Sequence, residues 1–307
     1  MSADGAAARP STTSTRGILV TRTLPRRLGA LTAAIALTAT LVAPGVAAGE
    51  APRGASLVTP SAGSAAAAGD TVTRSALQDD PIQVRSLDDA CPTDRVPSGG
   101  FGDSAGVYGR AIDCLVWYEI TAGRTATAFE PNGTVNRRQM AVFLHRMLDD
   151  IVDLPSYGGS SGFADVPDEG FGSAEINVLA SDEFAERFQV RIVSGRQDGR
   201  FDPGSRVTRE QMGSFVARTL QAVANANEGT ILPGSCGGPC FEDDDRIAPA
   251  HRDNVHLLFQ FGIVTGRANG DYDPKGDVLR GQMALFLTRT LDVVVESGGT
   301  VPPDERS

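Results

Sequence analysis

The sequence predicts an all-α protein built from three copies of one helix-loop-helix unit. Residues 120–148, 192–220 and 263–291 align without a gap, at shifts of 72 and 71 residues. Each window begins with a loop rich in Gly, Asp, Asn and Pro and ends in apolar residues at helical spacing. One such unit cannot bury its apolar face alone, so the three copies are expected to pack together.

Identical residues occupy eleven of the 29 aligned positions in all three windows. In the first window they are Ile120, Gly123, Arg124, Pro131, Val135, Arg137, Gln139, Met140, Phe143, Arg146 and Leu148. An aromatic residue also precedes each shared proline by two positions, as Phe129, Phe201 and Tyr272. This identity indicates three equivalent units rather than a chance resemblance.

A second helix is expected upstream of each loop, at residues 109–119 in the first copy and 251–261 in the third. The middle copy has about seven extra residues around positions 181–191. The predicted copies span residues 91–153, 160–225 and 236–295, and a polar tail follows at 296–307.

The N-terminal residues have a different composition. A basic stretch at 22–27 is followed by an uncharged apolar run at 28–42 and small residues at 43–48. That order is typical of a secretory signal peptide cleaved near Ala48. A membrane anchor is the alternative, but the run is shorter than the ~20 residues of a membrane span. Residues 49–90 are rich in Ala, Gly and Ser, which predicts a disordered, flexible tether.

The net charge restricts the class of partner. The whole chain carries −10, and removal of residues 1–48 takes away five arginines and Asp4, which leaves −14. A chain this acidic is not expected to bind nucleic acid or any polyanion through its overall field. An anionic ligand must therefore be held locally.

The four cysteines predict disulfides in an exported protein. Adjacency favours the pairs Cys91–Cys114 and Cys236–Cys240, although four cysteines allow three pairings. A zinc site is not expected, because the spacings are not CxxC and the histidines show no metal-binding spacing. No cofactor is predicted.

The repeat resembles the S-layer homology repeat, whose pattern includes Phe-x-Asp-Val, Gly-Ile-x-x-Gly and Thr-Arg-Ala-Glu. The counterparts here are Phe163-Ala-Asp-Val166, Gly262-Ile-Val-Thr-Gly266 and Thr208-Arg-Glu-Gln211, and the likeness covers roughly residues 91–295. The first copy departs from the pattern at Phe101-Gly-Asp103. The resemblance implies a pseudo-threefold spindle that binds a secondary cell-wall polysaccharide, often pyruvylated, in grooves lined by the Thr-Arg-Ala-Glu segments.

Those segments are residues 136–139, 208–211 and 279–282. Helix capping explains Thr208 with Gln211, but it does not explain an arginine at the first helical position, which is unfavourable by ~0.3–1 kcal/mol. We therefore predict an anion clamp at each helix start, and the alternative is pairing with an acid of a neighbouring copy. The third site, where Leu279 replaces the capping residue, is expected to be the weakest. The predicted ligand-binding residues are Arg137, Arg209, Arg280, Gln139, Gln211, Gln282, Thr208, Gly123, Gly195 and Gly266.

These features favour non-covalent attachment to an anionic polysaccharide, or another peptidoglycan-linked glycan, of a bacterial cell wall by a secreted protein. A structural envelope component that self-associates is one alternative, and the anchor part of a wall-acting enzyme is another. No catalytic residue is predicted. The segment 158–162 matches a nucleophile elbow in letters only, because it lacks the preceding buried strand.

Overall fold

The computed structural model describes residues 85–305, except 157, 158, 161, 230, 232, 233 and 235. The expected signal peptide and most of the expected tether lie outside these residues. The described part contains seven α-helices and short 3₁₀ turns, and its only β pairing is in isolated bridges. The predicted all-α class is confirmed.

The helices follow the predicted repeat. The first copy contributes α1 (Gly109–Trp117) and α2 (Arg137–Asp149). The second contributes α3 (Ser173–Ala180), α4 (Asp182–Phe188) and α5 (Arg209–Ala226). The third contributes α6 (Pro249–Gln260) and α7 (Arg280–Glu296), and the short turns are η2 (Asp244–Arg246) and η3 (Pro303–Glu305). Helix α4 accounts for the extra residues of the middle copy.

Each closing helix begins as the capping pattern predicts. The Asn136 side chain accepts the Gln139 N–H before α2, and Thr208 accepts that of Gln211 before α5. Before α7, Leu279 has no side-chain acceptor, but the Gln282 Oε1 still accepts the Leu279 N–H at 3.1 Å. All three helices therefore start at the repeated arginine.

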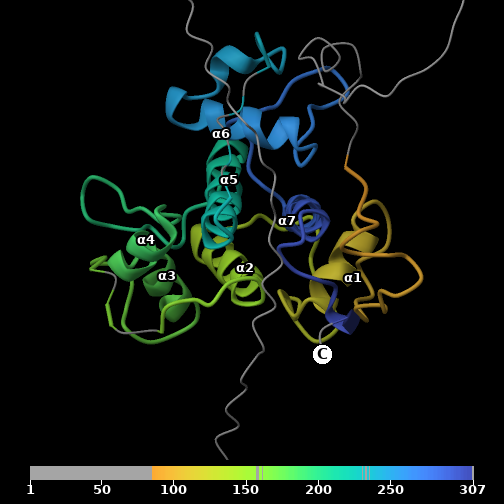
Figure 1. The fold of residues 1–307 in the computed structure, drawn as a ribbon, viewed down its shortest axis with the longest axis horizontal. Helices are drawn as coiled ribbons and strands as arrows, with labels where there is room; N and C mark the ends of the chain where they lie inside the picture. The colour runs from red at the N-terminus through yellow and green to blue at the C-terminus, as the bar shows by residue number, and fades with distance from the viewer. Residues whose placement is uncertain are drawn as a thin grey trace, which may run out of the picture. The chain divides into compact units, whose positions relative to one another are not determined.

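The three copies pack on one another in a cycle. Helix α2 packs on α3, α5 packs on α6, and α7 packs on α1 (Figure 1). The closing helix of each copy thus covers the opening helix of the next copy, and the last returns to the first. A small residue lets one of these pairs approach closely, since a Cβ on Gly281 of α7 would lie 2.4 Å from the Tyr108 ring.

Three short backbone segments join the copies at equivalent valines. The Val135 N–H donates to the Val278 carbonyl, Val278 donates to Val207, and Val207 donates back to Val135, at 2.9, 2.9 and 3.0 Å. This closed triangle places the starts of α2, α5 and α7 around one pseudo-threefold point, as the resemblance implied.

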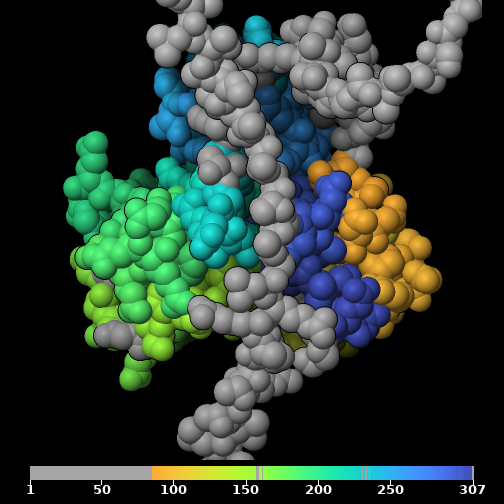
Figure 2. All heavy atoms as spheres, viewed as in Figure 1, coloured from red at the N-terminus to blue at the C-terminus, as the bar shows by residue number. Residues whose placement is uncertain are grey.

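The described chain starts to pack before the expected first copy. Leu87 and Ala90 are buried, and the Asp292 carboxylate of α7 accepts the N–H groups of Asp89 and Ala90. Residues 85–90, which the sequence analysis assigned to the tether, are therefore part of the packed structure. At the other end, Arg95 pairs with residues of η3, and Figure 2 shows the C-terminal residues against the start of the described chain.

Both favoured disulfides are present. Cys91–Cys114 joins the start of the first copy to α1, and Cys236–Cys240 closes a small loop ahead of η2. Among the helices described, none has the length and apolar character needed to cross a membrane.

Candidate ligand-binding site

The repeated arginines at the starts of α2, α5 and α7 insert into the loops of the next copy. We call these the first-copy loop (residues 120–135), the second-copy loop (192–207) and the third-copy loop (263–278). The Nε–H of Arg137 donates to the Phe201 carbonyl at 2.7 Å, and that of Arg209 donates to Tyr272 at 2.6 Å.

The last arginine closes the cycle, because the Nε–H of Arg280 donates to Phe129 in the first-copy loop at 2.7 Å. Each guanidinium also lies 4.5–4.7 Å from the ring centroid of the same aromatic residue. Such cation–π contacts contribute ~0.5–2 kcal/mol. The repeated arginine and the aromatic residue before the shared proline are therefore two halves of one contact between copies.

The alternative of pairing with acids applies to a different set of arginines. Within the described residues, no ion pair involves Arg137, Arg209 or Arg280. The arginine after each loop glycine takes the acid instead: Arg124 pairs with Glu130, Arg196 with Asp202 and Arg267 with Asp273. These three acids share a left-handed backbone, with φ of 60°, 61° and 57°.

The inserted arginines therefore hold their charge against carbonyl oxygens and aromatic faces. Burial lowers the pKa of Arg137, Arg209 and Arg280 below the ordinary arginine value. An arginine still remains protonated at neutral pH. The site thus carries buried positive charge without a directly paired carboxylate.

One of the three arginines has a buried nitrogen without a hydrogen-bond partner. Arg137 and Arg209 also donate through Nη2, to Ser194 at 3.1 Å and to Thr265 at 3.5 Å. The Nη2 of Arg280 is buried and has no hydrogen-bond partner, and the residue is only 4% exposed. An unsatisfied buried donor costs ~1–3 kcal/mol. Among the three inserted arginines, this cost falls on Arg280, at the place where it meets the first copy.

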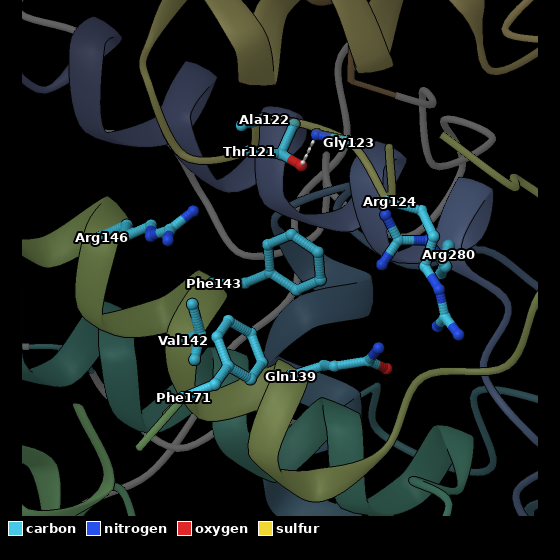
Figure 3. A pocket seen from close by; sticks show the side chains of 10 residues that line it. All are labelled: Thr121, Ala122, Gly123, Arg124, Gln139, Val142, Phe143, Arg146, Phe171 and Arg280. Atoms are coloured by element: carbon cyan, nitrogen blue, oxygen red, sulfur yellow. Dashed lines mark hydrogen bonds between the residues drawn. The ribbon is translucent and has the colours of Figure 1, made fainter. Parts of the chain in front are cut away.

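A pocket of about 380 Å³ opens there, and we call it the Arg280 pocket (Figure 3). Residues of all three copies line it: Thr121, Ala122, Gly123, Arg124, Gln139, Val142, Phe143, Arg146, Phe171 and Arg280. Three of the lining residues are arginines and none is acidic. Gly123, Gln139 and Arg280 are the predicted site residues that the fold brings together here.

Figure 3 shows how these side chains lie. Gln139 extends toward Arg280, and Phe143 stands between Arg146 on one side and Arg124 with Arg280 on the other. Phe171 comes from the second copy and is 61% exposed, which is unusual for a large apolar side chain. The pocket therefore combines a cationic wall with an exposed aromatic ring.

Phe171 was not among the residues predicted from the sequence, because it lies in the second copy and reaches the first only through the packing of α3 on α2. A signal was present, since Phe171 is flanked by Gly170 and Gly172 in a polar segment and has no apolar periodicity. Gly172 has φ +80°, and a Cβ there would lie 2.5 Å from the Arg138 side chain. The glycine thus lets the Phe171 segment lie close against α2.

The corresponding place between the second and third copies is built differently. Two sets of three buried residues, Ile112/Ile176/Val255 and Leu115/Leu179/Leu258, align the opening helices, so Phe171 corresponds to Ala250. Val142 corresponds to Ser214, whose Oγ lies 2.7 Å from the His251 Nδ1 and accepts the Asn254 amide at 3.0 Å. This polar cluster replaces the apolar wall of the Arg280 pocket, so Gln211, Thr208 and Gly195 border a chemically different surface.

The three predicted glycines also differ. Gly123 has φ +80°, and a Cβ there would lie 2.4 Å from the Phe101 ring. Gly195 has no positive φ but lies as close to the Phe163 ring, whereas a Cβ on Gly266 would meet nothing nearer than 3.2 Å. Gly123 therefore requires glycine for both its φ and its packing and Gly195 for its packing, whereas Gly266 makes the mildest of the three contacts.

An aspartate holds each loop in place. Asp103 accepts the N–H groups of Phe129 and Glu130, both at 2.8 Å, and Asp165 and Asp243 do the same in the other copies. The hydrogen bond from the Phe129 N–H, followed in size by the one from the Glu130 N–H, lowers the pKa of Asp103. The first copy therefore keeps the function of the Phe-x-Asp opening although its sequence there departs from the pattern.

Comparison with protein families agrees with this architecture. The model of the S-layer homology domain matches residues 191–212 and 241–284. The chain carries an S-layer homology domain. The match covers the second-copy loop with the start of α5 and most of the third copy, and the structural cycle relates the first copy to both. An S-layer homology domain implies anchoring at the cell surface.

Named relatives share the same region. An amylopullulanase from Thermoanaerobacterium thermosulfurigenes is 26% identical over 184 residues, which is 59% of this chain and 9% of that protein. An endoglucanase from Bacillus sp. (strain KSM-635) is 26% identical over 180 residues, or 59% of this chain and 17% of that protein. A cell surface protein from Thermoanaerobacter kivui is 30% identical over 192 residues, or 61% of this chain and 20% of that protein. The chain thus matches a fifth or less of each relative.

Proposed function

We propose that this chain attaches to a bacterial cell wall by binding an anionic secondary polysaccharide in the Arg280 pocket. The observation that carries the proposal is the buried, unpartnered Arg280 Nη2 beside a pocket that has three arginines and no acid. A carboxylate or phosphate is the complement of a guanidinium group, because it accepts charge-assisted hydrogen bonds. A pyruvyl group on a sugar would present such a carboxylate.

The rest of the pocket suits a sugar. Phe171 presents an exposed ring, and rings of this kind pack against the apolar faces of ligands. The amide of Gln139 and the hydroxyl of Thr121 are polar groups of the type that fix a ligand's orientation. The volume of about 380 Å³ lies at the small end of ligand sites, which favours a short glycan segment or chain end.

Binding in a local cationic pocket also explains how an acidic chain can hold an anionic polymer. The chain carries −10 overall, so it repels a polyanion at long range. Arg124, Arg146 and Arg280 reverse the sign within the pocket. Of these, Arg124 is partly balanced by Glu130, at 3.7 Å between Nε and Oε2. We expect binding that weakens as salt rises, because the contact is electrostatic and partly exposed.

The test is sedimentation with purified peptidoglycan sacculi, before and after the secondary polymer is removed. We expect the full chain to sediment with intact sacculi and to stay in solution with stripped ones. Arg124→Gln should reduce sedimentation several-fold, and the matched variant Arg267→Gln in the third copy should not. Equal sedimentation with both preparations would contradict the proposal.

The relatives support a second candidate. An amylopullulanase and an endoglucanase each match over a small part of their length, so this segment is also a candidate anchor for a wall-acting enzyme. A zymogram of the secreted protein on cell-wall material tests this, because a cleared band at its mass indicates catalytic activity. Self-assembly into an envelope layer is the third candidate, and light scattering of the purified chain would detect the large particles that it requires.

A further inference from the structure

A cluster of sulfur and nitrogen atoms lies outside the Arg280 pocket, in the third copy. The Sγ atoms of Cys236 and Cys240 and a ring nitrogen of His256 all lie within 4.8 Å of one another. Both sulfurs belong to the short disulfide loop ahead of η2, and His256 comes from α6. From sequence spacing alone these three residues did not suggest a metal site, since His256 is 16 positions beyond Cys240.

The histidine is held in one orientation. His256 is 7% exposed, and its Nε2 lies 2.6 Å from the Asp244 Oδ1. An ionised carboxylate accepts only, so it takes the hydrogen of Nε2 and leaves Nδ1 as the ring nitrogen that can bind a metal. Asp244 also accepts the Cys240 N–H through the same oxygen at 3.3 Å, which ties the cysteine loop to the histidine.

We propose that the reduced form of this cluster binds one zinc ion through Cys236, Cys240 and His256. Two thiolates and an imidazole are ligands that zinc prefers, and a carboxylate on the far ring nitrogen is the usual support for a zinc-bound histidine. Zinc–sulfur bonds of ~2.3 Å and zinc–nitrogen bonds of ~2.0 Å require the ligand atoms to lie within about 4 Å of one another. The present arrangement is within small side-chain movements of that geometry.

The disulfide and the zinc site exclude each other, because the same sulfurs serve both. A dithiol reductant breaks the Sγ–Sγ bond, supplies two electrons and two protons to the sulfurs, and leaves as its own disulfide. Zinc then displaces one proton from each thiol to solvent, and the fourth coordination position is open to water. Between the two cysteines the loop contains Gly237 and Gly238 followed by Pro239, and the two glycines give its backbone room to adjust to either form.

The second disulfide provides an internal control. Cys91 and Cys114 are fully buried, whereas Cys236 and Cys240 are half-buried. Mild phosphine treatment of the full chain should therefore reduce Cys236–Cys240 first, and mass mapping after alkylation will show which thiols are free. The reduced chain is then titrated with cobalt(II), whose thiolate complexes absorb in the near ultraviolet, and zinc is used to displace the cobalt.

We expect one cobalt per reduced chain and none in the oxidised chain. The variant with Cys236→Ser and Cys240→Ser should lose binding entirely, and His256→Gln should weaken it at least tenfold. Asp244→Asn should weaken it ~10–100-fold, as is found for supporting groups of metal ligands. The matched variant with Cys91→Ser and Cys114→Ser should bind as the parent does.

Two results would overturn the proposal. One is a reduced chain that keeps its helical circular dichroism and binds no cobalt, and the other is binding that survives loss of Cys236 and Cys240. If those serine variants do not fold, alkylation of the parent decides. Zinc must slow the alkylation of Cys236 and Cys240 at least tenfold, and equal rates with and without zinc would show that the disulfide has a structural role only.

Discussion

The first-copy loop and the third-copy loop have the same backbone plan, but they differ in how fully their inserted arginine is bound. In the third-copy loop, Arg209 donates through Nε to Tyr272 and through Nη2 to Thr265. In the first-copy loop, Arg280 donates to Phe129 but keeps a buried nitrogen without a partner beside an open pocket. Equivalent sequences thus yield one structural contact and one candidate binding site.

The comparison also changes how the repeated arginines are interpreted. Their position at the first residue of a helix suggested that each waits for an external anion. The structure shows that each first serves the fold, by joining one copy to the aromatic residue of the next. A binding test on Arg209→Ala would therefore mix loss of ligand with loss of stability, and the exposed pocket residues are better probes.

The largest effect is expected from removing Arg209. Arg209→Ala should lower the free energy of unfolding by about 3 kcal/mol, because it removes the donor to the carbonyl of buried Tyr272 and a cation–π contact with the Tyr272 ring. Arg280→Ala should cost about 1 kcal/mol less, since it also removes an unsatisfied donor. Urea unfolding of both variants measures the difference, and equal losses would mean that the two loops hold their arginines alike.

The loop glycines give the next largest difference. Gly123→Ala should lower the free energy of unfolding by about 2 kcal/mol, because it combines a positive φ with a collision against Phe101. Gly266→Ala should cost less than that, since Gly266 has no positive φ and its Cβ would lie 3.2 Å from the Gly270 carbonyl oxygen, a milder contact than the 2.4 Å at Gly123. Thermal and urea unfolding provide the measurement. A larger loss at Gly266 would contradict the assigned packing.

A smaller effect is expected on binding. Phe171→Ala should weaken sedimentation with intact sacculi about tenfold, which corresponds to ~1.4 kcal/mol, and should leave stability unchanged because the ring is 61% exposed. Val107→Ala is the matched control, since Val107 occupies the aligned position in the first copy and is 86% exposed. Similar losses in both variants would point to a general apolar attraction rather than to the Arg280 pocket.

The smallest effect concerns pH. The N–H donors of Phe129 and Glu130 lower the pKa of Asp103 below 3.8, so its folded form releases the proton more readily than the unfolded chain does. Its contribution to stability is therefore present above pH 3.8 and is lost as the pH falls through the lower folded-state pKa. Asp103→Asn should reduce the pH dependence of the urea midpoint between these two pKa values and leave it unchanged at higher pH. An unchanged profile would argue against this role of Asp103.

The sequence could predict what repeats within one copy. The windows at 120–148, 192–220 and 263–291 gave the closing helices, their capping and the arginine at each start, and adjacency gave both disulfides. These features depend on residues a few positions apart, or on identity between copies.

The features that the sequence could not predict depend on which copies contact one another in the folded chain. Arg280 reaches Phe129 across 151 positions because the cycle closes, and no local pattern encodes that contact. Phe171 joins the pocket through the packing of α3 on α2. His256, on α6, approaches Cys236 and Cys240 only in the folded chain, and this contact is the basis of the zinc site proposed above.

The most direct test of the Arg280 pocket is an NMR titration of the isotope-labelled full chain with a soluble fragment of the anionic wall polymer. We predict that the resonances of the Gly123 backbone amide and the Gln139 side-chain amide shift with the same saturation curve, while those of Gly266 and Gln282 do not shift. Shifts of equal size at both sets of residues, or shifts confined to the third-copy loop, would contradict it.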